Sequence, residues 1–195
     1  MRKVGIFSTV IVVIFCAGFA IAQHFNPGSE PDGFRGILWG TDLSTLAGMK
    51  FVTSRDIGGS FPESVWDFER GALKKQIKVD IYEKPEDDTP LYGVVVETIR
   101  YGFWKGKFRE VTIFVRGQDN LKTFNDGVFD RFGKGTTAAL PSVKLGDEQP
   151  DWHYWMGRIS EMELIHIPMS QLSKFWIGST LVRDQAFKEA WMYQN

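Results

Sequence analysis

Apolar residues alternate with more polar ones along two stretches near the middle of the chain. The alternation runs from Ile77 to Ile81 and returns from Val111 to Val115. A period of two sends successive side chains to opposite faces of a strand, so both stretches predict half-buried β-strands. With the β-rich run of residues 92–103 between them and Gly106 in a hairpin turn, residues 77–116 predict three antiparallel strands in meander order.

A helical pattern follows these strands. Large apolar residues recur at spacings of three and four from Leu121 to Phe132, which places them on one face of a helix. We expect Asp119 to cap the start of this helix and Gly133 to cap its end. An apolar stripe must be covered by another element, and the preceding meander offers a sheet, so the pattern predicts an α+β fold.

The C-terminal third repeats this order of elements. Residues 152–167 predict a hairpin that turns near Gly157, residues 175–182 predict a further strand, and Asp184 is expected to cap a last helix. Residues 134–151 are expected to form a loop. The order predicts an α+β fold with an antiparallel meander sheet and helices packed on one face, arranged as two helix–sheet halves.

The N-terminus predicts a secretory signal peptide. Arg2 and Lys3 form a positive start, an apolar run extends to Phe19, and Ala20-Ile21-Ala22 offers the small residues that a signal peptidase reads. An uncleaved membrane anchor is the alternative, although the run is at the short end of a bilayer span of about 17–25 residues. We expect a signal peptide at 1–22, a flexible linker at 23–33 and a single α+β domain at 34–195, exported to the periplasm or secreted.

Cleavage of the signal peptide would change the chemistry of the mature chain. It removes Cys16, the only cysteine, so that the core alone must stabilise the fold. It also removes two positive charges, Arg2 and Lys3, from a chain whose formal net charge is −1. This mild acidity provides no basic stripe, so we expect no nucleic-acid partner, and no membrane span once the signal is cleaved.

No motif for catalysis, a cofactor or a metal stands out. Gly133-Lys134-Gly135 is similar to the end of a phosphate-binding loop, but Gly135 replaces the required Ser or Thr and the helix precedes the loop. Ser60 lies in a glycine-rich loop that lacks a nucleophile-elbow pattern. We therefore expect no catalytic residues, no cofactor and no metal site.

The histidines and a pair of glutamates are candidates for a local site. His24 lies in the expected linker, and His166 shares a strand with Glu161 and Glu163. Alternation places both glutamates on the face opposite His166, so this strand does not provide a local ligand set. The two carboxylates share a face, and one pKa would rise if they were desolvated, but a solvent-facing strand is the simpler interpretation.

Aromatic residues provide the strongest candidates for a binding surface. Trp152, His153, Tyr154 and Trp155 are consecutive, so both faces of that strand carry rings, and Trp104 lies beside a basic turn. Exposed rings mark contact surfaces, and the alternative is that helices or neighbouring strands cover these rings. We expect a binding site at Trp104, Trp152, His153, Tyr154 and Trp155.

Short glycine and aromatic strings punctuate the chain. They are Gly36-Ile37-Leu38-Trp39-Gly40, Gly106-Lys107-Phe108, Phe132-Gly133-Lys134-Gly135 and the aromatic strand from Trp152 to Trp155. In these strings the chain resembles a loose group of small, uncharacterised exported bacterial proteins, and the resemblance brings no catalytic residues with it. We predict an exported, non-enzymatic binding module of the cell envelope that uses an aromatic-rich sheet surface to bind an envelope protein or a small ligand. The alternative is an envelope hydrolase with dispersed histidine and carboxylate groups or a Ser–His pair.

Overall fold

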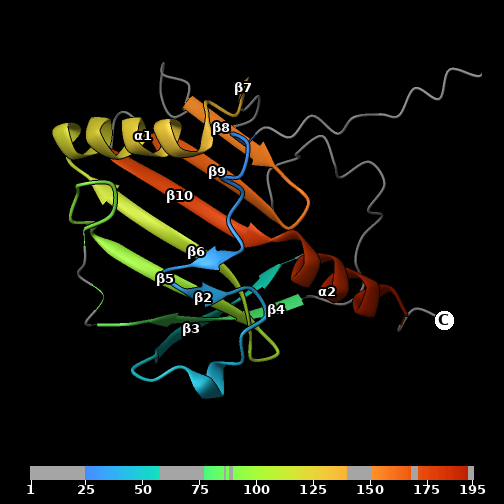
Figure 1. Cartoon of the computed structure of the whole chain (residues 1–195). Helices are drawn as coiled ribbons and strands as arrows, with labels where there is room; N and C mark the ends of the chain where they lie inside the picture. The colour runs from blue at the N-terminus through green and yellow to red at the C-terminus, as the bar shows by residue number, and fades with distance from the viewer. Residues whose placement is uncertain are drawn as a thin grey trace, which may run out of the picture.

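The computed structural model describes residues 25–57, 77–85, 87, 90–139, 151–167 and 171–192. Its main element is an eight-stranded antiparallel sheet in the order β3-β4-β5-β6-β10-β9-β8-β7 (Figure 1). The strands are β3 (Lys50–Ile57), β4 (Ile77–Glu83), β5 (Thr98–Trp104), β6 (Lys107–Arg116), β7 (Thr136–Ala139), β8 (Asp151–Met156), β9 (Ser160–Ile167) and β10 (Leu172–Ser179). A small second sheet pairs β1 (Gly33–Phe34) with β2 (Ile37–Leu38). The prediction of an α+β fold with an antiparallel sheet is confirmed.

The large sheet consists of two four-stranded meanders, each followed by a helix. Helix α1 (Gln118–Phe132) follows β6, and helix α2 (Thr180–Met192) follows β10. The two meanders join where β6 pairs antiparallel with β10. The predicted meander over residues 77–116 is confirmed as β4, β5 and β6, and the predicted hairpin around Gly157 is confirmed as β8 and β9.

Several element boundaries differ from those expected. Residues 134–151, expected as a loop, include β7, which pairs with β8. Helix α2 begins at Thr180 rather than at Asp184, because the Ser179 hydroxyl accepts a hydrogen bond from the Val182 N–H at 3.2 Å and so supports the first turn.

The ends of α1 were predicted in part. Gly133 ends the helix as expected, and its N–H donates to the Phe129 carbonyl at 2.8 Å. Asp119 lies within the first turn rather than at the N-cap, which is Gly117 and makes no side-chain cap bond. A carboxylate inside the first turn still favours the positive end of the helix dipole.

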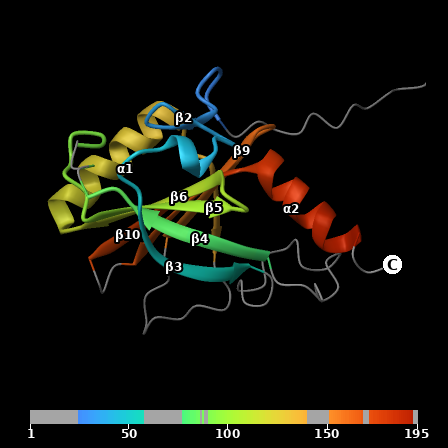
Figure 2. The same cartoon turned by 90° about the horizontal axis from the view of Figure 1, so that it is seen from below.

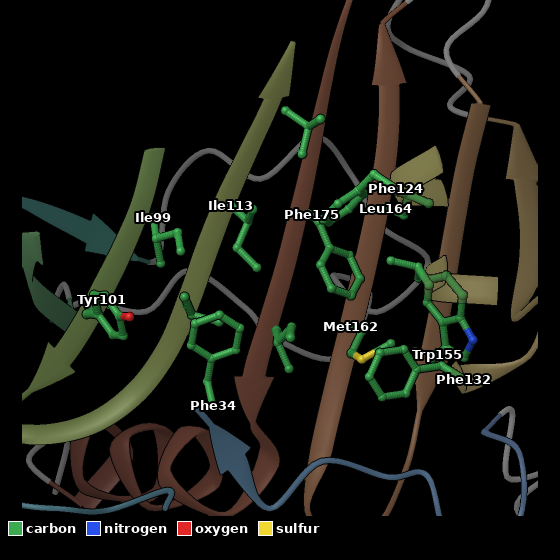
Figure 3. Packing of buried hydrophobic residues seen from close by; sticks show 14 of the residues in the cluster. Phe34, Ile99, Tyr101, Ile113, Phe124, Phe132, Trp155, Met162, Leu164 and Phe175 are labelled. Atoms are coloured by element: carbon green, nitrogen blue, oxygen red, sulfur yellow. The ribbon is translucent and has the colours of Figure 1, made fainter. Parts of the chain in front are cut away.

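One face of the sheet packs against α1 and forms the larger core. The apolar stripe of α1 is buried as predicted, and the Phe124 ring lies 5.7 Å from the Phe175 ring of β10. Figure 3 shows side chains from neighbouring strands pointing to this same side. The labelled residues on the large sheet are Ile99, Tyr101, Ile113, Trp155, Met162, Leu164 and Phe175, all of them buried.

The N-terminal segment lies against this core. Phe25 exposes only 7% of its surface and makes an edge-on contact with Phe132, with ring centroids 6.1 Å apart. A Glu30 carboxylate oxygen accepts hydrogen bonds from the N–H groups of Ile159 at 2.7 Å and Ser160 at 3.0 Å. The described part of the expected linker, residues 25–33, is therefore packed against the domain. The predicted signal peptide and the loop containing Ser60 lie outside the described residues.

Helix α2 packs in a second, smaller core on the other side of the sheet. Val182 is buried with Val79 of β4 and Trp104 of β5. Along those strands these residues alternate with Tyr82 and Phe103, which belong to the larger core, so the two cores lie on opposite faces. The expectation that both helices pack on one face is therefore not confirmed. Neither α1 nor α2 is long and apolar enough to cross a membrane.

Candidate functional site

The face of the sheet opposite α1 carries a cluster of charged side chains. On β9, Glu161 and Glu163 alternate with the core residues Met162 and Leu164. On β10, Lys174 alternates with buried residues in the same way. We call this side the charged face and define it by Arg55, Arg109, Glu110, Glu161, Glu163, Lys174 and Arg183.

Glu110 lies at the centre of the ion pairs on this face. It exposes 1% of its surface and accepts hydrogen bonds from the guanidinium groups of Arg55 and Arg109. Opposite it on β5 stands Gly102, where a Cβ atom would lie 2.5 Å from the Glu110 Cγ, so the glycine makes room for the carboxylate. From α2, Arg183 pairs with Glu161 and brings the helix onto the same face.

The Arg55–Glu110 pair requires a strongly curled sheet. Arg55 lies on β3 and Glu110 on β6, three strands away in the sheet order. In a flat sheet that separation would be about 14 Å, farther than an arginine side chain extends. Seen from below, β3 and β4 lie on the side of the sheet away from α1 (Figure 2). The charged face is therefore the inner side of the curl.

Burial shifts the pKa of several groups on the charged face. Burial raises the pKa of the Glu163 carboxyl, against the opposing effects of Lys174 and Arg55. Burial lowers the pKa of the Lys174 amine, and Arg55 adds to that shift. Burial also lowers the pKa of Arg109, although a guanidinium remains charged at neutral pH. These groups from β3, β6, β9 and β10 thus form one electrostatic cluster.

Four buried N–H groups on this face lack a hydrogen-bond partner within the described part of the chain. They are Nε of Arg55, Nε of Arg109, and the indole Nε1 of Trp152 and of Trp176. All four are donors. A buried donor without a partner costs about 1–3 kcal/mol, so a ligand that offers acceptors to these groups would relieve that cost.

The structure separates the five residues that the sequence predicted for binding. Trp152 and Tyr154 lie on the charged face, half-buried, with ring centroids 5.5 Å apart. His153 alternates with them and faces the α1 side, 4.8 Å from the Phe129 ring. Trp155 exposes 1% of its surface, and its indole donates to the Gly133 carbonyl at 3.0 Å.

Trp104, the fifth predicted residue, belongs to the second core. It exposes 6% of its surface, and the Lys105 amine lies 4.9 Å from the centre of its ring. A binding role would need Trp104 and Trp155 to be exposed, and both are buried because a helix covers each of them. Of the five predicted residues, Trp152 and Tyr154 lie on the charged face.

Most of the charged face is not predicted by the sequence analysis. Glu161 and Glu163 were noticed, but the simpler interpretation of a solvent-facing strand is wrong, since Glu161 pairs with Arg183 and Glu163 is partly desolvated. One signal was available: Lys174 sits between Ser173 and Phe175, both fully buried, in a strand at the centre of the sheet. A charge alternating with core residues on a central strand indicates a polar interior.

The histidines do not join the carboxylates. His166 pairs with Ser173 across the strands on the α1 side, where its Nδ1 lies 3.2 Å from the serine hydroxyl. Among the described residues, no three His, Cys, Asp or Glu side chains gather closely enough to hold a metal ion. Glu161 and Glu163 therefore lie on one face of the sheet, and both strand histidines lie on the other.

A separate pocket opens near the N-terminal segment. It has a volume of about 300 Å³, and its polar lining includes Arg35, Lys84, Asp87 and Tyr101. The Asp87 carboxylate already pairs with Arg35 and accepts a hydrogen bond from the Tyr101 hydroxyl.

Comparisons with known proteins found no matching family model, no matching curated protein and no matching solved structure.

Proposed function

We propose that the mature chain is an exported binding module of the bacterial cell envelope and that it binds its partner on the charged face. The unpartnered buried N–H donors of this face carry the proposal. Buried ion pairs seldom stabilise a fold more than apolar residues of similar size would. A face that served stability alone would therefore be apolar, whereas this one holds charges and donors whose benefit comes on binding.

The proposal of export rests on residues 1–22. A positive start, an apolar run and a small-x-small site before Gln23 support cleavage by a signal peptidase. N-terminal sequencing of the protein from its native envelope is expected to begin at Gln23. A full-length product that stays in the membrane would contradict this part of the proposal.

The non-enzymatic character rests on the pairing of the carboxylates. Glu110 is held by two guanidiniums and Glu161 by a third, so neither is placed as a free acid or base. The raised pKa of Glu163 favours the hydrolase alternative, because general acids have such shifts. A hydrolase would need a second group opposite Glu163, and the strand histidines face away.

Capture from the native envelope tests the binding proposal. The chain from Gln23 onward would be immobilised as wild type, as Lys174→Met and as Lys122→Met, and the bound proteins and small molecules identified by mass spectrometry. Lys122 is the matched control, since it lies exposed on α1 and pairs only within the helix with Asp126. We expect wild type and Lys122→Met to retain the same molecule and Lys174→Met to lose it. Equal capture by all three folded proteins would overturn the proposal.

A further inference from the structure

We infer that the charged face binds a small amphipathic organic anion, with a carboxylate or phosphate head on an apolar body. This inference rests on the proposed binding function and names the ligand class. It combines three observations: two guanidiniums that share one carboxylate, unpartnered donors without matching acceptors, and an apolar row beside them.

Two guanidiniums share one carboxylate at the centre of the cluster. Arg55 and Arg109 both pair with Glu110. The other cations have carboxylates beside them, since Arg183 pairs with Glu161 and Asp184 and Lys174 lies close to Glu163. An anionic head group would supply a second acceptor to the two guanidiniums that share Glu110.

The unpartnered groups select the same ligand chemistry. Arg109 exposes 5% of its surface, and within the described part of the chain neither its Nε nor that of Arg55 has a hydrogen-bond partner. The indole N–H groups of Trp152 and Trp176 also lack a partner among the described residues. The two guanidinium donors need acceptors close to Glu110, and the oxygens of a carboxylate or phosphate are acceptors only.

An apolar row lies beside the charges. Lys174 is paired across the strands with Phe114 on one side and Ile165 on the other, and Ile165 is paired with Trp152. All are half-buried and point to the charged face. This row lies four residues along the strands from the row of Glu110 and Glu161, a distance of about 13 Å. Trp176 stands between the two rows, so a ligand with a charged end and an apolar chain of that length matches the face.

An NMR titration of the whole mature chain tests the inference. The probes are decanoate, decyl phosphate, 1-decanol and inorganic phosphate, and the signals are the tryptophan indole N–H resonances, assigned with Trp152→Phe and Trp176→Phe. We expect decanoate or decyl phosphate to shift the Trp152 and Trp176 signals, with decanol and inorganic phosphate each at least about tenfold weaker. The better of the two amphipathic anions identifies the head group.

Matched variants locate the binding on the charged face. Arg55→Met keeps the apolar stem and is expected to weaken binding of the anionic probe about fivefold or more, while Lys122→Met leaves it unchanged. Equal binding of decanol and decanoate, or no effect of Arg55→Met, would overturn the inference. If envelope capture succeeds and all four probes fail, the binding function stands and the ligand class is wrong. If the capture also fails, both proposals fall.

Discussion

Glu110→Gln is the sharpest test of the charged face. The substitution keeps the size of the side chain and one oxygen acceptor but removes the negative charge that Arg55 and Arg109 share. Arg109 and Glu110 expose 6% and 1% of their side chains, so this pair is screened little by water. Arg55 exposes 34% and can recover hydration, so its share of the loss is smaller.

The expected loss follows from this burial. Removing one partner of a buried ion pair costs about 3–5 kcal/mol, and the retained amide oxygen places Glu110→Gln near the lower end, about 3 kcal/mol. Urea denaturation followed by tryptophan fluorescence measures the free energy of unfolding. The matched control is Glu97→Gln, because Glu97 pairs with Arg116 at 3.0 Å on the surface and that loss should stay below about 1 kcal/mol. If both variants lose the same small amount of unfolding free energy, the cluster is hydrated and the Arg109–Glu110 pair is not buried as described.

Three further predictions concern the core, the pH dependence and a helix glycine. Phe124→Ala should lower the unfolding free energy by about 3–5 kcal/mol in urea, as the Phe124 ring is fully buried, and a loss under about 1 kcal/mol would refute the packing of α1. Because burial raises the pKa of Glu163 above its usual 4.5, the folded state holds that proton more tightly and loses stability as the pH rises through the window above 4.5. In urea titrations from about pH 4 to about pH 7, Glu163→Gln should therefore become more stable relative to wild type as the pH rises. A difference in unfolding free energy that stays constant with pH would contradict the raised pKa. Gly127→Ala should destabilise α1 despite a helix-propensity gain of about 1 kcal/mol, since its Cβ would lie 2.5 Å from the Tyr92 Cβ, and a higher melting temperature would refute this.

The sequence predicted the elements whose residue pattern coincides with one covered face. The alternation from Ile77 to Ile81 and the stripe from Leu121 to Phe132 are both buried as expected, because each presents large apolar side chains to one side only. The aromatic strand behaved differently. Trp152 and Tyr154 alternate with His153 and Trp155, so both faces look alike in sequence, and the position of α1 decides which rings are buried.

The charged face depends on contacts that no local pattern contains. Arg55 and Glu110 are 55 residues apart, and they meet only because the sheet curls. Read alone, β9 resembles a half-exposed strand with two surface glutamates. Curling brings Arg55 toward Glu163, and α2 brings Arg183 to Glu161, so the same two glutamates become part of a poorly hydrated cluster.

The position of α2 explains how the charged face loses contact with solvent. The two halves have the same order of elements, which predicted helices on one side and would have left the other side of the sheet open to water. Instead, Val182 anchors α2 in the second core, and Arg183 follows onto Glu161. With β3 curled over from the opposite edge, the charges of this face lose solvent, the pKa of Glu163 rises, and the indole and guanidinium donors are buried without partners. The affinity of this face for an anion would therefore come from the whole fold, through one helix on the unexpected side, rather than from a motif that a sequence could display.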